Sequence, residues 1–245
     1  MRKRADQVLV ERGLADSRSR AQALIAAGLV IQGTVPIDKP GRLIAADANL
    51  ALAGLDHPWA SRAGLKLVAA LDHFDIDPKS ATALDIGAST GGFTDVLLAR
   101  GAARIYAVDV GHDQLLPRLR ADPRVIVLER LNARHLTRGE VPEPVGIITC
   151  DASFIGLETV LPAALALAAP GARLVALIKP QFEAGPGQVG KGGIMRDPDL
   201  QDRICRRVAA WLGGRAGWRV LGTTDSPIDG GDGNREFLIA AEYQP

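Results

Sequence analysis

A glycine-rich turn flanked by two acidic residues lies at residues 81–94, in the sequence ATALDIGASTGGFT. An apolar run that carries Asp85 breaks at Gly87, and the chain then reaches a glycine pair and a segment with helical character. A second apolar run, ARIYAVDV, carries Asp109. Glycines let a ligand approach the backbone, a helix start presents free N–H groups, and an acid roughly 20 residues beyond such a turn often holds a ribose diol. The pattern predicts a nucleotide-type pocket, with an ordinary strand–turn–helix corner as the alternative.

Three ligands are candidates for this pocket. A nicotinamide dinucleotide requires Gly-x-Gly-x-x-Gly, but from Gly87 the second glycine position is Ser89, which hinders the approach of a pyrophosphate. An ATP-type phosphate loop has its spacing at residues 185–191, but Gly192 replaces the Ser or Thr that would hold magnesium. S-adenosyl-L-methionine has no phosphate, and it needs an acid before the turn, glycines and an acid for its ribose. The residues favour this third ligand. The matching set is Asp85, Gly87, Gly91 and Asp109.

Apolar runs alternate with helical segments from residue 81 onward, which predicts a doubly wound, Rossmann-like α/β sheet. The expected strands are Ala83–Ile86, Ile105–Val108, Val125–Leu128, Gly146–Cys150, Arg173–Ile178, Trp218–Leu221 and Glu236–Ala241. The expected helices are Gly92–Arg100, Leu157–Ala168 and Pro198–Leu212. The short connection at residues 223–233 predicts that the last strand is antiparallel. Ligands of such a sheet bind at the carboxyl ends of its strands.

The amino-terminal segment has a different pattern. Apolar residues at helical spacing predict helices at Arg2–Leu14 and Arg18–Ala27, with Leu24 and Ile25 facing inward. Two short strands with a turn at Gln32–Gly33 follow the second helix. This pattern predicts a small α+β module.

Basic charge is concentrated in this module. Residues 1–42 carry eight Lys or Arg against four Asp or Glu, although the whole chain has a net charge of only +1. The asymmetry indicates a polyanion-binding module attached to a neutral body, with a solvated helix face as the alternative. We expect an RNA-binding domain at residues 1–50, a linker at 51–60 and the α/β domain at 61–245.

Composition excludes several other classes of protein. Cys150 and Cys205 have no partner motif, and the four histidines lack ligand spacing, so we expect neither a disulfide nor a metal site. The start, MRKRADQ, is not followed by the apolar core of a signal peptide. The longest mainly apolar stretch, Val160–Ala169, is too short to cross a bilayer and contains Pro162. We expect a cytoplasmic protein without a membrane segment.

Residues 1–50 resemble the alpha-L RNA-binding domain of the ribosomal-protein S4 type. The likeness is carried by RADQVLVERGLADSRSRAQALIAAGLVIQG and the KPG that follows. Such domains bind structured RNA mainly through phosphates and shape. The resemblance implies RNA contacts at Arg4, Arg18 and Arg20.

Six motifs follow in order: LDIGASTGGFTDVLL, YAVDVGHDQL, TCDASFIGL, LIKPQFE, VGKGGIMRD and GNREFL. Together with the preceding RNA-binding module they resemble the TlyA (haemolysin A) family, which is similar to the FtsJ-type ribose 2′-O-methyltransferases. Those enzymes use a Lys-Asp-Lys-Glu tetrad. The matching positions are Lys66, Asp151, Lys179 and Glu236.

This tetrad suits the deprotonation of a ribose hydroxyl. A hydroxyl is a poor nucleophile, and a lysine can accept its proton if burial or a second cation lowers the lysine pKa. Lys179 ends an apolar run, and Lys66 provides a second positive charge. We expect Asp151 to orient the lysine or the attacking group and Glu236 to hold a lysine ammonium.

The spacing and the resemblance also assign cofactor contacts. Leu131 and Asn132 follow the third expected strand, where such enzymes often touch the adenine, and His112 is a further candidate for the adenosine pocket. The expected contacts are Asp85, Gly87, Ala88, Ser89, Gly91, Gly92, Phe93, Asp109, Val110, Leu131, Asn132 and Asp151.

Two features keep two interpretations each. The glycine-rich loop at residues 185–193 is either a flexible connector or a lid over RNA, in which case Lys191 and Arg196 contact the RNA. Trp59 is either a platform for an RNA base or a wedge between domains.

We therefore expect an enzyme that methylates a ribose 2′-hydroxyl, and the resemblance implies a cytidine in ribosomal RNA or a ribosomal subunit as the target. An RNA-binding ribosome-assembly factor with an inactive methyltransferase fold is the alternative, and the intact tetrad argues against it. A membrane-lytic haemolysin is disfavoured because the sequence has no spanning run and no strongly amphipathic cationic helix with aromatics. The sequence does not indicate an oligomeric state.

Overall fold

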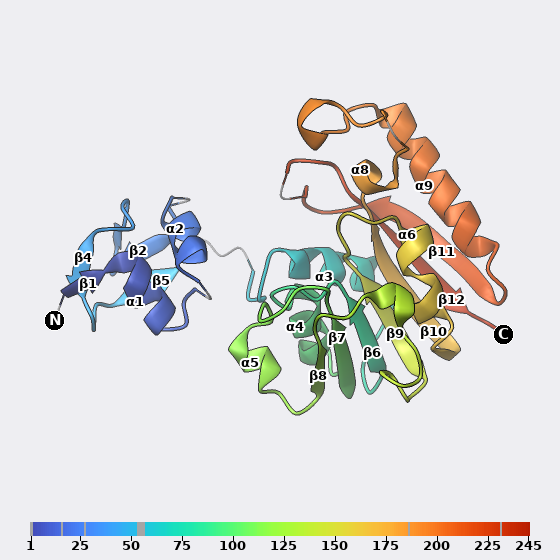
Figure 1. The fold of residues 1–245 in the computed structure, drawn as a ribbon, viewed down its shortest axis with the longest axis horizontal. Coiled ribbons are helices and arrows are strands. Elements are labelled where there is room, and N and C mark those ends of the chain that lie inside the picture. The colour runs from blue at the N-terminus through green and yellow to red at the C-terminus, as the bar shows by residue number, and fades with distance from the viewer. Residues whose placement is uncertain (1, 16, 27, 53–56, 186, 231) are drawn as a thin grey trace. The chain divides into compact units, whose positions relative to one another are not determined.

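The computed structural model describes residues 2–15, 17–26, 28–52, 57–185, 187–230 and 232–245, without the side chains of Ser19, Arg20, Ala23 and Lys191. The chain forms two compact units, Met1–Pro58 and Trp59–Pro245. In Figure 1 the first unit is coloured blue, and the second runs from cyan to red.

In its described residues, the amino-terminal unit combines two helices with two small antiparallel sheets. Its elements are β1 (Arg2–Arg4), α1 (Ala5–Glu11), α2 (Arg18–Ala26), β2 (Val30–Gln32), β3 (Val35–Pro36), β4 (Leu43–Ala45) and β5 (Leu50–Leu52). Strand β1 pairs with β4, and β2 lies between β3 and β5. The helix expected at Arg2–Leu14 is wrong at both ends, because its first residues pair with β4 as a strand and α1 ends at Glu11.

A small core holds these elements together. Val8 of α1 and Leu24 and Ile25 of α2 are buried with Val30 of β2. The structure therefore confirms that Leu24 and Ile25 face inward. Helix α2 begins with Arg18, whose side chain is 55% exposed, so the buried face of the helix leaves this basic residue accessible.

A seven-stranded sheet forms the centre of the larger unit (Figure 1). Its strands are β6 (Thr82–Ile86), β7 (Arg104–Val108), β8 (Val125–Leu128), β9 (Val145–Cys150), β10 (Ala168–Ile178), β11 (Trp218–Asp225) and β12 (Phe237–Tyr243). Their order is β11-β12-β10-β9-β6-β7-β8. Strands β6 to β10 pair in parallel, and β12 is antiparallel to both neighbours. The doubly wound sheet with an antiparallel last strand is confirmed.

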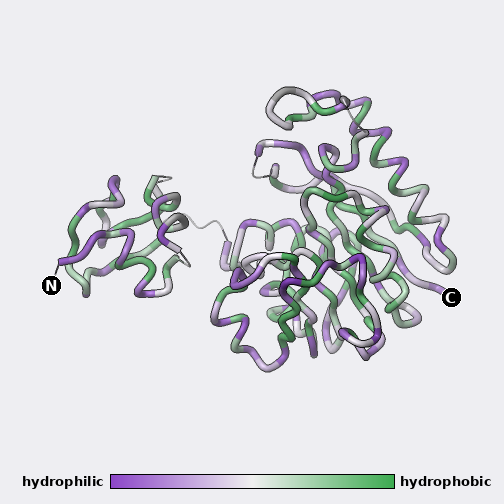
Figure 2. The backbone as a smooth tube through the Cα atoms, viewed as in Figure 1, coloured by the Kyte–Doolittle hydropathy of each residue, from purple (hydrophilic) through white to green (hydrophobic). Residues whose placement is uncertain are grey.

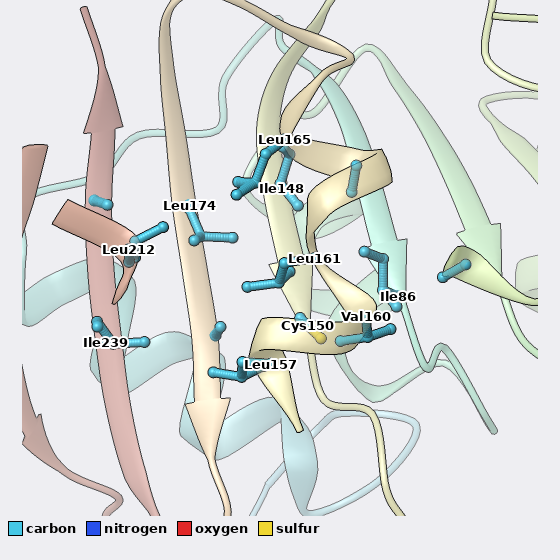
Figure 3. Close-up of a cluster of buried hydrophobic side chains, with 14 of the residues drawn as sticks. Ile86, Ile148, Cys150, Leu157, Val160, Leu161, Leu165, Leu174, Leu212 and Ile239 are labelled. Carbon is cyan, nitrogen blue, oxygen red and sulfur yellow. The ribbon is translucent and has the colours of Figure 1, made fainter. Parts of the chain in front are cut away.

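Each face of this sheet carries its own hydrophobic core, because successive side chains of a strand point to opposite faces. One face is covered by α3 (Ala63–His73), α4 (Gly92–Ala99) and α5 (Pro117–Arg120). The other is covered by α6 (Leu157–Val160), α7 (Pro162–Leu165) and α9 (Pro198–Gly213). Figure 3 shows Leu161 and Leu165 of this second core beside Ile148 and Leu174 of the strands. In Figure 2 the most hydrophobic segments of the larger unit run along its strands.

The helix expected at Leu157–Ala168 is wrong in its continuity. Helix α6 ends at Val160, α7 starts at Pro162, and Ala168 already belongs to β10. Proline has no N–H to donate and its ring hinders the turn before it, so Pro162 begins a new helix rather than extending the first. The short elements α8 (Pro180–Glu183) and the 3-10 turns Ala133–His135 and Lys191–Gly193 have no periodic apolar pattern that could have predicted them.

Helix α9 forms from strong local signals, as expected. Asp197 caps it by accepting hydrogen bonds from the backbone N–H groups of Asp199 and Leu200, and Pro198 occupies its first position. Ile204 and Val208 share its buried face. Neither α9 nor any other helix in the described ranges combines the length and apolarity needed to cross a membrane.

Candidate active site

The glycine-rich turn joins the end of β6 to the start of α4. Gly87 has a φ of +79°, and a Cβ there would lie 3.0 Å from the backbone oxygen of Asp151. The Asp151 N–H in turn donates to the backbone oxygen of Ile86 at 2.9 Å. Gly91 has a φ of +101°, a left-handed conformation that favours glycine. The turn therefore holds the carboxyl ends of β6 and β9 together where the strand order reverses, which is where ligands of such sheets bind.

A pocket of about 290 Å³ lies at this point. Its wall comes from the turn after β6, the segments after β9 and β10, the start of α3 and the segment before β12. The candidate catalytic residues in this wall are Lys66, Asp151, Lys179 and Glu236. The candidate cofactor residues in it are Gly87, Ala88, Ser89, Gly92, Phe93 and Asp151. The tertiary structure thus brings all four members of the expected tetrad to one cavity.

Lys66 and Glu236 form the first ion pair of the pocket. Lys66 lies on the buried face of α3, and its Nζ donates to Glu236 Oε2 at 2.5 Å. The two side chains are only 9% and 4% exposed. Gly230 packs against the carboxylate, since a Cβ at this position would lie 2.6 Å from Glu236 Oε1. The lysine therefore ends on a buried carboxylate and not in solvent.

Lys179 and Asp151 form the second ion pair. Lys179 directly follows β10 and Asp151 directly follows β9, and the two strands are parallel neighbours, so both side chains leave the same edge of the sheet. Lys179 Nζ lies 2.7 Å from Asp151 Oδ1 and donates to Ser153 Oγ at 3.0 Å. Ser153 was missed in the sequence, although its position two residues after Asp151 is a usable signal.

The pocket therefore holds two ammonium groups and two carboxylates in balance. None of the four side chains is more than 14% exposed. An unpaired buried charge is strongly unfavourable, whereas a paired and hydrogen-bonded one is tolerated. This arrangement can hold a lysine amine in a defined position beside a bound substrate.

Asp85 lies behind the pocket and does not line it. Its side chain is fully buried, and it accepts hydrogen bonds from the hydroxyl groups of Thr94 at 2.7 Å and Thr149 at 3.0 Å. Burial raises the pKa of Asp85 to about 6, against the opposing effect of the two hydroxyl donors. In this structure the residue links β6 to α4 and β9, and so supports the glycine-rich turn from within.

Asp109 lies at the carboxyl end of β7 with its carboxylate already engaged by the backbone. One oxygen accepts from the Ser89 N–H at 2.8 Å, and the other accepts from the Gly111 N–H at 2.7 Å. Val110 beside it is 70% exposed. Asn132, after β8, caps the 3-10 turn by accepting from the Arg134 N–H at 3.1 Å. These residues, with Leu131, sit at the ends of β7 and β8, outside the pocket wall described above.

An aromatic pair at the pocket was missed in the sequence. Phe154 and Phe182 both line the cavity, and their ring centroids lie 4.9 Å apart. Phe154 is 88% exposed and has a φ of +63°, which is strained for a bulky residue. The exposed ring and the strained backbone make Phe154 a candidate for contact with a ligand.

Glu183 ties together the two segments that carry Asp151 and Lys179. It is buried, it accepts from the Leu157 N–H at 2.7 Å, and it pairs with Arg207 at 3.2 Å. Burial raises the pKa of Glu183, while the Leu157 N–H and Arg207 act in the opposite direction. Its place at the end of the LIKPQFE motif is the signal that could have identified it.

The candidate RNA-binding residues lie in both units. Arg4 and Arg18 are in the amino-terminal unit, and both bind the carboxylate of Asp6. Arg196 is exposed on the larger unit. The side chains of Arg20 and Lys191 lie outside what the structure describes.

The structure also shows the surroundings of Trp59, His112 and the loop at residues 185–193. Trp59 packs on the start of α3, where a Cβ at Gly64 would lie 2.5 Å from its ring, so it belongs to the core of the larger unit. His112 is exposed. The far end of the loop at residues 185–193 is anchored by buried Asn234, which binds the Gly193 oxygen at 3.0 Å. Within the described ranges, no cluster of three or more His, Cys, Asp or Glu residues is placed to hold a metal ion.

Known proteins resemble the chain over nearly its full length. The FtsJ-like methyltransferase pattern matches residues 59–243, and the S4 domain pattern matches residues 3–48. TlyA of Mycobacterium tuberculosis, named a 16S/23S rRNA (cytidine-2′-O)-methyltransferase, is 46% identical over 97% of this chain and 89% of its own. Bacillus subtilis YqxC, provisionally named an rRNA methyltransferase, is 45% identical over 97% and 85%. A solved structure from Streptococcus thermophilus, provisionally described as a hemolysin, has a TM-score of 0.79 at 40% identity and covers 99% of this chain and 89% of that one.

Proposed function

The chain belongs to the FtsJ-like methyltransferase family and carries an S4 domain, and from this premise we propose that it methylates a ribose 2′-hydroxyl of ribosomal RNA with S-adenosyl-L-methionine. The observation that carries the proposal is the convergence of two lysine–carboxylate pairs in one pocket, Lys66 with Glu236 and Lys179 with Asp151. The names of TlyA and YqxC support rRNA as the substrate, and the name of TlyA supports a cytidine.

The turn after β6 fits the methionine and ribose parts of this cofactor. Gly87 and Gly92 line the pocket and let the segments that carry Asp151 and Ser61 pack closely against the turn. Asp109 keeps unused lone pairs for ribose hydroxyls, since each carboxylate oxygen accepts only one backbone N–H. Val110 and Leu131 offer apolar surface to an adenine at the ends of β7 and β8. Bound there, the cofactor supplies a methyl group on an activated sulfonium.

Lys179 is the proposed general base. Once the proton it carries in the ion pair with Asp151 has left to solvent, the Lys179 amine would accept the proton of the ribose 2′-hydroxyl as that oxygen attacks the activated methyl group. Asp151 and Ser153 hold that amine in place, which limits the attack to one geometry. The ion pair of Lys66 with Glu236 fixes a second cation in the same pocket wall, where it can bind the ribose or its phosphate.

Phe154 and Phe182 are proposed to stack the base of the target nucleotide. Proteins read unpaired RNA by stacking splayed bases on aromatic rings, and each such contact is worth about 1–3 kcal/mol. The ribose of a stacked nucleotide would then lie next to the catalytic lysine. An enzyme that acts in this way needs a target that is unpaired or flipped out.

The S4 unit is proposed to dock on folded RNA. Arg4 and Arg18 are 42% and 55% exposed, and each keeps N–H donors for phosphate oxygens. Arg196, and the loop that precedes it, would contact the RNA near the pocket. Because the substrate is ribosomal RNA or a ribosomal subunit, we place the reaction in the cytoplasm.

The decisive experiment is mass spectrometry of ribose methylation in rRNA from cells with and without the protein. We expect one or more 2′-O-methylcytidines to disappear in its absence and to return with the wild-type gene. Lys179→Ala should not restore them, whereas Lys79→Ala, which changes an exposed lysine before β6, should. An unchanged methylation pattern would favour an inactive assembly factor, and full restoration by Lys179→Ala would rule out the proposed base.

A further inference from the structure

Asp6 is a fully buried carboxylate at the start of α1, surrounded by basic groups. Its Oδ1 accepts from Arg4 Nε at 3.0 Å. Its Oδ2 accepts from Arg4 Nη2 at 2.9 Å, from Arg18 Nη2 at 3.3 Å and from Gln22 Nε2 at 3.1 Å. The hydrogen bonds from Arg4 hold the pKa of Asp6 well below its usual range despite burial, so the group is ionised at neutral pH.

One carboxylate oxygen thus holds two guanidinium groups side by side. Arg4 and Arg18 repel each other as free cations, and the shared anion between them removes this obstacle. Asp6 occupies only part of their capacity, because a guanidinium has five N–H donors and Arg4 uses two of them on this carboxylate. The remaining donors belong to side chains that are 42% and 55% exposed.

The turn after β3 fixes Arg4 from the other side. The backbone N–H of Asp6 donates to the Pro40 oxygen at 3.1 Å, which holds this turn against the start of α1. A Cβ at Gly41 would lie 3.2 Å from Arg4 Nη1, so a glycine lets the guanidinium rest on the backbone. The Arg4 side chain is therefore oriented before any ligand arrives.

We propose that Asp6 is a positioning residue that sets Arg4 and Arg18 as one paired clamp for a phosphate of folded RNA. The inference rests on the proposed function, in which the S4 unit binds rRNA. Arginine loses considerable rotamer freedom when it binds, so ordering both side chains in advance reduces the entropic cost of docking. A buried acidic residue beneath the exposed arginines therefore strengthens RNA binding.

The test compares Asp6→Asn with Glu11→Gln in the full-length protein. Both remove one negative charge from the same unit, but Glu11 is exposed and its described side-chain partner is Lys3. The probe is 16S and 23S rRNA transcribed in vitro. The dissociation constant of its complex with the protein is measured from about 50 to about 300 mM KCl, and the slope of the logarithm of this constant against that of the salt concentration reports the number of phosphate contacts. Methylation rates on the same transcripts separate kcat from KM.

For Asp6→Asn we expect the dissociation constant to rise about tenfold. The dependence of this constant on salt should weaken by the equivalent of about one phosphate contact. KM for RNA should rise while kcat stays unchanged. Glu11→Gln should bind RNA as tightly as the wild type or more tightly. Equal or tighter binding by Asp6→Asn would overturn the proposal, because it would make Asp6 a mere opposing charge.

A second measurement covers the case in which Asp6→Asn unfolds the amino-terminal unit, as circular dichroism would reveal. Arg4→Ala, Arg18→Ala and the double variant are compared in the wild-type background. A clamp acts as a unit, so the double variant should bind little more weakly than either single variant. If the loss of RNA affinity in the double variant equals the product of the two single losses, the arginines act independently and the clamp is overturned. If neither arginine matters, the proposed RNA-binding role of these residues fails with it.

Discussion

Lys66 and Glu236 are 170 positions apart in the chain, yet their charged groups meet at 2.5 Å in the wall of the pocket. The lysine comes from the first helix of the larger unit, and the glutamate immediately precedes its last strand. The active-site wall is therefore closed by the two ends of the methyltransferase unit. The same contact makes the site depend on the complete folding of the sheet between them.

Glu236→Gln should destabilise the larger unit and abolish methylation. It leaves the buried Lys66 ammonium without a counter-charge, and breaking one partner of a buried pair costs about 3 kcal/mol. Asp72→Asn is the matched control, because it breaks the exposed pair of Asp72 with Arg100 and should cost less than about 1 kcal/mol. Urea unfolding followed by tryptophan fluorescence measures both, since Trp59, Trp211 and Trp218 all lie in this unit. Equal losses for the two variants would contradict the buried-pair account.

Asp85 should make stability depend on pH. Burial raises the pKa of Asp85 to about 6, above the value of a free carboxyl, so the folded state binds its proton more tightly than the unfolded state. The residue therefore stabilises the fold most below pH 4, and this contribution is lost as the pH rises to about 6. Relative to Asp85→Asn, the free energy of unfolding of the wild type should fall by on the order of 2–3 kcal/mol across that window.

Urea unfolding of the two proteins at about pH 3.5, 4.5, 5.5, 6.5 and 7.5 checks this prediction, because these values span the window between the pKa of a free carboxyl and that of the buried Asp85, about 6. Above pH 6.5 the difference between the proteins should be constant. A difference that does not change with pH would mean that Asp85 titrates as an ordinary carboxyl.

Gly92→Ala should weaken cofactor binding through a steric mechanism. A Cβ at Gly92 would overlap Ser61 Oγ and lie 3.2 Å from the backbone nitrogen of Gly64, so the start of α3 must move. Gly101→Ala is the control: its φ of +85° makes it strained, but its Cβ meets only ordinary contacts from 3.5 Å. Calorimetry with S-adenosyl-L-homocysteine should show a loss of about tenfold or more for the first variant alone. Similar affinities of the two variants for S-adenosyl-L-homocysteine would mean that the contact between position 92 and Ser61 does not affect cofactor binding.

Phe154→Gly should lower activity without lowering stability. The ring is 88% exposed and contributes little to the core, whereas glycine relieves a φ of +63°. Phe154→Ala removes the same ring but keeps the strained backbone, so it should be about 1 kcal/mol less stable than the glycine variant. Both should raise KM for RNA about tenfold, as expected for one lost stacking contact. Unchanged kinetics in both variants would exclude base stacking at this position.

Local sequence determined most of the larger unit. The apolar runs became strands of the doubly wound sheet, and the glycines at positions 87 and 91 adopt the left-handed conformations that the turn requires. Such features depend on neighbouring residues, whose periodicity and steric limits are readable in one dimension. One error has a local cause, because Pro162 divides a helix. The other has a non-local cause, because Arg2–Arg4 pairs with a strand about 40 positions away, beyond the reach of any periodicity argument.

Only the tertiary structure decided which charged groups meet. The resemblance of the sequence to a known family implied Lys66, Asp151, Lys179 and Glu236 as a set, but the fold decided that they form two pairs. It also turned Asp85 towards two threonine hydroxyls and away from the pocket wall, and it placed Asp6 between two arginines. The physical reason is that side-chain burial and charge pairing depend on segments that approach only when the chain folds, whereas turn conformation and strand alternation are set by adjacent residues.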